Sequence, residues 1–345
     1  MKKIFTASIL SLFASAAMAQ DFTAAGASSA RTLYVKWAES YGQKNNIKLS
    51  YQAAGSAEGI KLAKSKAVDF GATDFNLSAE ESRSAKLISI PSAVTGIVPV
   101  VNLPEAKSGE LRLSGEVLAE IYMRKITKWN DAAIAALNPG VNLPKIGITV
   151  VARSDGSGAT YNFTEYLSTV SQDWKNAYGR NMTVKWAADV QQVKGSDEMS
   201  AAVRQTAGAI GYIDYKFAVQ DKLGMAQLKN RDGKFVAPNG RRFASAVQNS
   251  AWTKGQFDDT LINRAGGATW PITAGAFMLL PSSTNKPQAT IALLKFISWT
   301  LAKGDHLADG ADFVALPHAV QAQVFAELTK ITDNRGQPLQ WSPAL

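Results

Sequence analysis

Apolar residues recur along the chain at two spacings that alternate over most of its length. In the first, they fall every three or four positions on one helix face, as in residues 31–44 and 287–302. In the second, short apolar runs typical of buried strands appear, such as "AVDFGA" at 67–72 and "AIGYI" at 209–213. Similar segments predict helices at 58–66, 118–123 and 196–206, and strands at 49–52, 146–152 and 276–280. This alternation predicts an α/β protein with parallel or mixed sheets covered by helices.

The stretch "ARSDGSGAT" at 152–160 joins one predicted strand to the next predicted helix. The apolar face of that helix consists of Phe163, Tyr166, Leu167 and Val170. The first N–H groups of a helix have no partner within it, and the positive end of its dipole attracts anions. Arg153 adds a full positive charge beside this entrance. The alternative interpretation is that Asp155 or Ser157 only caps the helix and Gly158 only turns the chain.

Two other predicted helices begin in the same way, after short stretches of small residues that contain serine. "AAGASSA" at 24–30 places Ser28 and Ser29 before one helix, and "AAGSAEG" at 53–59 places Ser56 before another. "DFGATD" ends a strand with Asp74 at its carboxyl end, the edge where open α/β sheets bind ligands. Each stretch by itself also fits a simple cap or turn. Together they predict an anion site built from helix entrances.

The N-terminal stretch "MKKIFTASILSLFASAAMA" has the layout of a secretory signal peptide. Two lysines precede an apolar run, and the ending "AMA" predicts cleavage after Ala19. The run is too short and too rich in serine for a good spanning helix. The chain has no cysteine, so it offers neither a lipid anchor nor a disulfide. We therefore expect a free periplasmic protein.

The charge and the remaining motifs exclude several function classes. The formal net charge of +9 falls to +7 without Lys2 and Lys3, which favours anionic partners, but the basic residues are scattered rather than gathered into a nucleic-acid-binding tract. Only His306 and His318 could serve as histidine bases, and no metalloprotease or G-x-S-x-G motif is present. "GSGAT" lacks the lysine of a nucleotide-binding P-loop. We expect a binding protein rather than an enzyme, without a metal site or a cofactor.

The motifs "AAGASS", "YQAAGS", "DFGATD", "KITKWND", "LNPG", "RSDGSG", "AIGY" and "WPIT" resemble, in order and spacing, the periplasmic phosphate-binding proteins that serve ABC-type phosphate importers. The resemblance implies a two-lobed periplasmic-binding-protein fold of the Venus flytrap kind, each lobe a mixed sheet flanked by helices, with phosphate in the cleft between them. It assigns residues 20–93 and 268–345 to lobe 1 and residues 94–267 to lobe 2. The implied partners are phosphate and the permease subunits of the importer, and the protein is expected to be a monomer.

The resemblance also implies which residues contact phosphate. These are Ser28, Ser29, Ser56, Asp74, Arg153, Ser157, Gly158 and Ala159. Asp155 is expected to hold the Arg153 guanidinium in place. Asp74 has the wrong charge for an anion site, yet an ionised carboxylate accepts hydrogen bonds only, so it can select phosphate by its proton and repel sulfate.

The chain departs from the family pattern in three places, which involve four residues. Ser29 and Ala30 stand where an aromatic or apolar residue and a proline are usual, and Glu58 replaces a small residue. Ala159 replaces a hydroxyl residue, which leaves Thr160 as the nearest substitute donor. The sequence leaves arsenate or a phosphonate open as alternative ligands of the same fold. It also leaves open a role as an exported phosphate binder at the cell surface.

Overall fold

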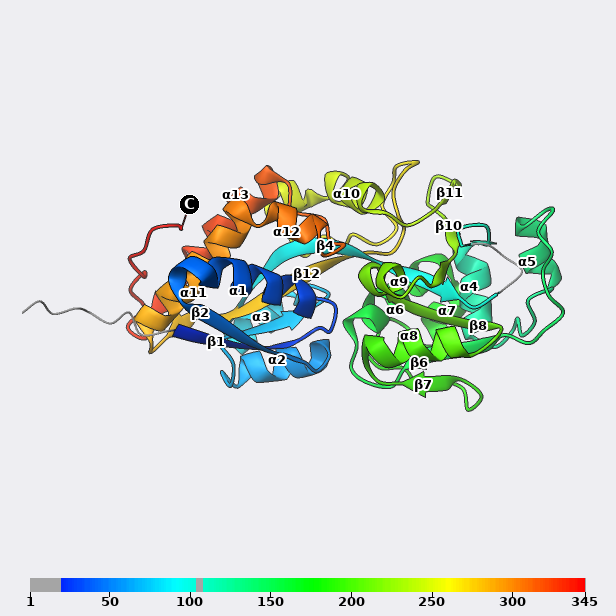
Figure 1. The fold of residues 1–345 in the computed structure, drawn as a ribbon, viewed down its shortest axis with the longest axis horizontal. Helices are drawn as coiled ribbons and strands as arrows, with labels where there is room; N and C mark the ends of the chain where they lie inside the picture. The colour runs from blue at the N-terminus through cyan, green and yellow to red at the C-terminus, as the bar shows by residue number, and fades with distance from the viewer. Residues whose placement is uncertain (1–19, 104–107, 345) are drawn as a thin grey trace, which may run out of the picture.

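The computed structural model describes residues 20–103 and 108–344, so the predicted signal peptide lies outside the described residues. Its main element is a nine-stranded sheet with the order β2-β1-β3-β12-β4-β8-β6-β7, in which β9 also pairs with β4. Figure 1 shows the elements gathered in two groups, which we call the first lobe and the second lobe. No helix in the described part of the chain has the length and hydrophobicity needed to span a membrane.

The first lobe, on the left of Figure 1, is a mixed sheet covered by helices. Its parallel strands are β1 (Gln20–Gly26), β2 (Ile47–Ala53) and β3 (Phe70–Thr73), and β12 (Thr273–Pro281) runs antiparallel to β3. The helices are α1 (Arg31–Asn45), α2 (Ser56–Lys64), α3 (Ala79–Ala85), α11 (Pro287–Lys303), α12 (Asp305–Asp309) and α13 (His318–Leu328). Two short strands, β13 (Ser283–Thr284) and β14 (Thr332–Asp333), form a separate pair.

The second lobe has its own strands and helices. The strands that continue the main sheet are β6 (Thr149–Arg153), β7 (Gln191–Val193), β8 (Ala209–Asp214) and β9 (Gly224–Met225). The helices are α4 (Gly115–Tyr122), α5 (Ala132–Leu137), α6 (Gly158–Val170), α7 (Gln172–Ala177), α8 (Gly195–Gln205) and α9 (Tyr215–Gln220). A small sheet contains β5 (Arg112–Leu113), β10 (Gln227–Lys229) and β11 (Phe235–Val236).

Strand β4 (Leu87–Val101) belongs to both lobes. From Leu87 to Gly96 it pairs with β12, and from Ile97 to Val101 it pairs with β8. Helix α10 (Gly240–Gln248) packs on this strand, and the 3-10 helix η1 (Ala251–Lys254) packs on α10 and α13. A Cβ at Gly96 would lie 2.3 Å from the Phe243 ring of α10, so the close packing requires glycine there. The lobes therefore share one continuous buried strand.

The predicted elements are present, with shifted ends. The helices predicted at 31–44 and 287–302 are α1 and α11. The helix predicted at 58–66 begins two residues earlier, because Gly55 turns the chain at φ 88° and places Ser56 inside the first turn of α2. The strand predicted at 67–72 begins only at Phe70 and ends at Thr73, directly before Asp74.

Candidate anion-binding site between the lobes

Three strand-to-helix turns converge between the lobes, and two of them place a serine against Asp74. The turn before α1 supplies Ser29, whose Oγ donates to Asp74 Oδ1 at 2.5 Å. The turn before α2 supplies Ser56, whose Oγ donates to Asp74 Oδ2 at 3.4 Å. Both serines are fully buried. The two serine-bearing entrances of the first lobe and its strand-end aspartate thus form one cluster.

The entrance of α6 approaches this cluster from the second lobe. A Cβ at Gly158 would lie 2.4 Å from both Asp74 Oδ2 and Ser56 Oγ, so only glycine allows the helix to come this close. One turn further, Asn162 Nδ2 donates to the Asp74 carbonyl oxygen at 2.8 Å. The structure therefore brings together Ser29, Ser56, Asp74 and Gly158, four of the residues singled out in the sequence.

Arg153, the last residue of β6, is held by Asp155 through two hydrogen bonds. Arg153 Nε donates to Asp155 Oδ1 at 2.6 Å, and Nη2 donates to Oδ2 at 2.5 Å. The Arg153 side chain is only 3% exposed. Burial by itself would raise the pKa of Asp155, but the guanidinium lowers that pKa below its usual value. Asp155 therefore binds the arginine side chain, whereas the N-cap of α6 is Ser157.

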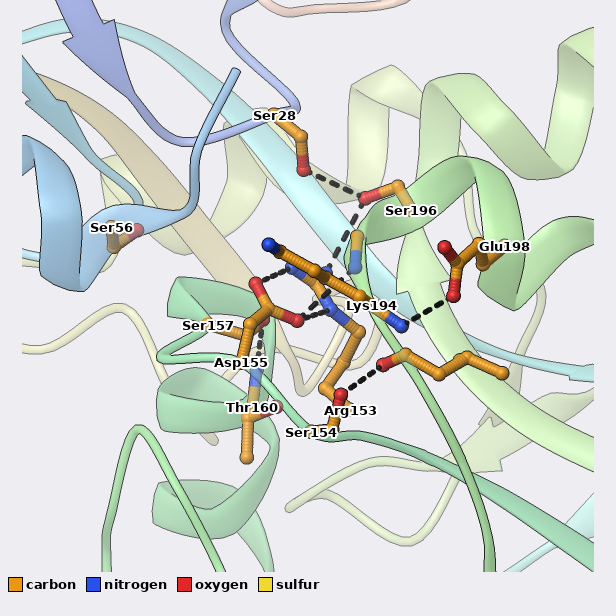
Figure 2. Close-up of polar contacts among 12 residues, drawn as sticks. Ser28, Ser56, Arg153, Ser154, Asp155, Ser157, Thr160, Lys194, Ser196 and Glu198 are labelled. Carbon is orange, nitrogen blue, oxygen red and sulfur yellow. Dashed lines mark hydrogen bonds and ion pairs between the residues drawn. The ribbon is translucent and has the colours of Figure 1, made fainter. Parts of the chain in front are cut away.

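Ser157 caps α6, because its Oγ accepts a hydrogen bond from the Thr160 N–H at 3.2 Å. Its own hydroxyl proton is not used by that bond, so Ser157 can still donate to an anion. Ala159 is 2% exposed and follows Gly158 in the first turn. Figure 2 shows Ser157 and Thr160 next to the Asp155 and Arg153 pair.

Thr160 is engaged elsewhere. Its Oγ1 and the Tyr212 hydroxyl are 2.7 Å apart, and the same Tyr212 oxygen accepts from the Arg153 N–H at 3.1 Å. Thr160 therefore steadies the end of β6 through Tyr212. This contact makes it a poor substitute for the hydroxyl that Ala159 lacks.

Two further positions complete the sequence-based set. Ser28 is half-buried and its Oγ lies 3.0 Å from Ser196 Oγ at the start of α8. Glu58, in the first turn of α2, forms an ion pair with Lys61 at 3.2 Å, and its side chain is 34% exposed. The negative charge of Glu58 is thus partly compensated and screened by solvent.

Sequence reasoning missed Ser196 and Asp214. Arg153 Nη1 donates to Ser196 Oγ at 3.5 Å, so Ser196 connects the arginine to Ser28, as Figure 2 shows. Asp214 is 1% exposed, and its Oδ1 has no hydrogen-bond partner within the described residues. It ends β8 in "GYID" just as Asp74 follows β3 in "GATD", so the same strand-end signal could have found it.

Burial and repulsion from Asp74 raise the pKa of Asp214 to about 7, although Arg153 and Lys216 oppose the shift. Burial likewise raises the pKa of Asp74, while the hydrogen bond from Ser29 and the charge of Arg153 lower it. Two acids with raised pKa values therefore stand near one arginine, which is itself neutralised by Asp155.

We expect Asp214 to make the folded protein less stable as the pH rises. Its pKa of about 7 in the folded state lies above the value of about 4 in an unfolded chain, so the folded state binds more protons in that range. The contribution is fully present below about pH 4 and is lost as the pH rises through about 7. The melting temperature should fall less between pH 5 and pH 8 for the Asp214→Asn variant than for the parent. The exposed Asp21→Asn variant is the control, and an equal drop in all three proteins would contradict the expectation.

The lobes contact each other directly at the site. Ala57 N–H donates to the Gly156 carbonyl oxygen at 3.1 Å, and the Phe75 and Tyr161 rings stack with centroids 3.9 Å apart. Together with the Ser28 to Ser196 contact, these bonds join α1 and α2 to α6 and α8. The structure is therefore a closed arrangement of the two lobes.

Comparison with known proteins agrees with this fold. Residues 13–303 match the model of the PBP superfamily domain. A human phosphate-binding apolipoprotein has the same fold, with a TM-score of 0.69 and 20% identity over 89% of this chain and 94% of that chain. The protein is thus a member of the PBP superfamily, and the predicted periplasmic-binding-protein fold is confirmed.

Similar protein sequences identify the family within this superfamily. The chain is 41% identical over 340 residues to the phosphate-binding protein PstS of Pasteurella multocida, covering 98% of both chains. It is also 41% identical over 309 residues to PstS of Haemophilus influenzae, covering 89% of this chain and 92% of that protein. The chain belongs to the PstS family of phosphate-binding proteins.

Proposed function

We propose that this protein binds inorganic phosphate between its lobes and delivers it to an ABC-type importer. The observation that carries the proposal is the buried Arg153 and Asp155 pair, facing a cluster of serines and Asp74 built at helix entrances. Membership of the PstS family supports the same ligand. The proposed contacts are Ser28, Ser29, Ser56, Asp74, Arg153, Ser157, Gly158 and Ala159, with Asp155 and Thr160 in support.

Each element of the site has a defined part in this proposal. The hydroxyls and the first N–H groups of the helices donate to phosphate oxygens, and Arg153 adds a charge-assisted contact. Asp74 accepts a hydrogen bond from the P–OH group of mono- or dibasic phosphate, a donor that fully ionised sulfate lacks. No residue is assigned a catalytic part, so we propose a transport receptor rather than an enzyme.

The cellular setting is also part of the proposal. Residues 1–19 have the sequence of a signal peptide, so the mature chain would act in the periplasm and meet the permease subunits there as a monomer. We propose residues 20–93 and 268–345 as lobe 1 and residues 94–267 as lobe 2. The change of partner along β4 between Gly96 and Ile97 supports a boundary within that strand.

Calorimetry of the mature chain tests the function directly. Phosphate, sulfate, arsenate and a phosphonate are titrated separately into protein freed of bound anion. We expect phosphate to bind at the site between the lobes, and sulfate neither to bind at that site nor to displace phosphate from it. Arsenate carries the same protons and should also bind, whereas a phosphonate places a carbon where the closed site offers hydrogen-bond donors. Binding of sulfate as tight as that of phosphate would contradict the proposal.

Phosphate is expected to close the lobes, because the proposed contacts come from both and only the closed form satisfies them together. Small-angle X-ray scattering should therefore give a smaller radius of gyration with saturating phosphate than without it. The control for nonspecific compaction is the Arg153→Ala variant, which is expected not to hold phosphate. It is measured in the same two buffers, with and without phosphate. A radius that stays constant while calorimetry reports binding would indicate a rigid receptor.

Ala159→Thr is expected to tighten phosphate binding by about 0.5 to 1.5 kcal/mol, up to about tenfold in Kd, because it adds a donor that Thr160 does not supply. Ala159→Val is the matched control, since valine has nearly the same shape without the hydroxyl. Calorimetric titration of both variants separates the hydrogen bond from crowding. If threonine binds no better than valine, this corner of the site does not reach the ligand.

A further inference from the structure

A cavity of about 370 Å³ opens between the lobes next to the site. Its lining comes from α1 of the first lobe, with Arg31 and Lys36, and from α8 and α9 of the second, with Asp197 and Lys216. Ser28 belongs to the same lining. The cavity therefore ends at a residue of the proposed phosphate site.

The cavity carries an excess of positive charge. Three of its lining residues are cations and one, Asp197, is an anion. Arg31 is exposed, and its side chain forms no hydrogen bond or ion pair among the described residues. Lys36 is held in place because its Nζ donates to the Gly310 carbonyl oxygen at 2.7 Å. An excess of positive charge in a concave surface attracts small anions.

Lys216 is the buried cation of the cavity. Its side chain is 5% exposed, and its Nζ donates to Thr32 Oγ1 across the lobes and lies 4.4 Å from the centre of the Phe217 ring. An ammonium group has three donors, and the bond to Thr32 uses one of them. Burial lowers the pKa of Lys216. The charges of Asp214 and Asp197 oppose this shift, and those of Lys36 and Arg31 add to it. An anion in the cavity would relieve the repulsion among these three cations.

A chain of polar contacts connects the cavity to the buried arginine. Ser28 Oγ, at the cavity, lies 3.0 Å from Ser196 Oγ, which in turn accepts from Arg153 Nη1 at 3.5 Å. Figure 2 shows Ser28 and Ser196 facing each other across the gap between the lobes, with Arg153 beyond them. When the lobes separate, the Ser28 and Ser196 contact must open, and the part of the lining on α1, which begins beside Ser28, parts from the lining on α8 and α9.

We propose that this cavity is a second oxyanion site, which captures inorganic phosphate before it enters the closed site. This proposal rests on the proposed function only in taking phosphate as the anion that passes from the cavity to the closed site. Sulfate is the probe that separates the two sites, because Asp74 excludes it from the closed site while the outer cavity offers only cationic and donor groups apart from Asp197.

The first experiment follows backbone amide NMR signals of α1 and α9 while sulfate replaces chloride at constant, low ionic strength. We expect the signals to shift with sulfate concentration and to reach saturation. Sulfate should bind at least about tenfold more weakly to the Arg31→Gln/Lys36→Gln variant. The Lys44→Gln/Lys48→Gln control removes the same charge from exposed positions of the first lobe and should bind sulfate as the parent does. The shifts should persist in Arg153→Ala. Shifts that fail to saturate, fall equally in the control pair, or vanish in Arg153→Ala would overturn the second site.

The second experiment tests capture by stopped-flow measurement of phosphate association at low and high salt. The Arg31→Gln/Lys36→Gln variant should associate about three- to tenfold more slowly than the Lys44→Gln/Lys48→Gln control at low salt, and the two should agree at high salt, where screening is strong. Equal rates at low salt would overturn the capture role. The sulfate titration needs no phosphate, so a failure of the proposed function, seen as absent phosphate binding in the parent, is distinguished from a failure of the outer site.

Discussion

Arg153→Ala is expected to weaken phosphate binding by at least about 100-fold. The arginine is the full positive charge closest to the proposed contacts, and each hydrogen bond to a charged group contributes roughly 1.5 to 3 kcal/mol. Its removal also leaves the Asp155 carboxylate, whose side chain is 12% exposed, without its partner beside the incoming anion. Calorimetry with phosphate, combined with a thermal unfolding curve to establish that the variant is folded, measures the effect.

The matched control for this variant is Arg204→Ala. Arg204 lies in the last turn of α8 in the same lobe and is exposed, so its loss changes the net charge equally without touching the site. We expect the affinity of the control to stay within about twofold of the parent. If both variants lose affinity to the same extent, the effect comes from net charge, and the site does not lie at Arg153.

Asp74→Asn is expected to let sulfate bind, with an affinity at least about tenfold above that of the parent. The ionised carboxylate offers sulfate only acceptors, whereas an amide in the same place can donate to an unprotonated oxygen. The hydrogen bonds from Ser29 and Ser56 fix this side chain against the entrance of α6, so the substituted group stays in the site. Competition of sulfate against phosphate, followed by calorimetry, gives the selectivity.

Glu58→Gln is the control for Asp74→Asn. It removes one negative charge close to the site, but Glu58 is paired with Lys61 and partly exposed. We expect its selectivity to equal that of the parent. If sulfate is excluded from the Asp74→Asn variant as strictly as from the parent, another group recognises the proton on phosphate. Asp214 is then the first candidate, because it is buried and interacts with both Asp74 and Arg153.

Local patterns in the sequence were sufficient to predict where the helices begin and that Asp74 lies at the end of a strand. Ser29, Ser56 and Gly158 were found because a strand, a turn of small residues and an apolar helix face follow one another within about 15 positions. Ser196 could not be found in this way, because its part depends on α8 meeting α1 across the two lobes. Contacts of that kind are fixed by tertiary packing rather than by local pattern.

Strand β4 shows a second limit of the sequence patterns. Its segment "LISIPSAVTGIVPVV" contains Pro91 and Pro99, which argue against a central strand because proline lacks the N–H that a ladder needs. The structure accommodates Pro91 through a shift of register opposite Ala276 and Phe277. The bulged residue is Ser92 of β4 itself, but the bulge forms only opposite β12, more than 180 positions away in the chain.

The shared strand also determines how the molecule can be divided. Cutting the chain into separate lobes would leave β4 without β12 or without β8, and would uncover residues such as Ile97 and Val98 that are now fully buried. An unpaired apolar strand edge recruits other chains and promotes aggregation. Neither lobe is therefore an autonomous folding module, and fragments made for biochemical work should be planned around an intact β4.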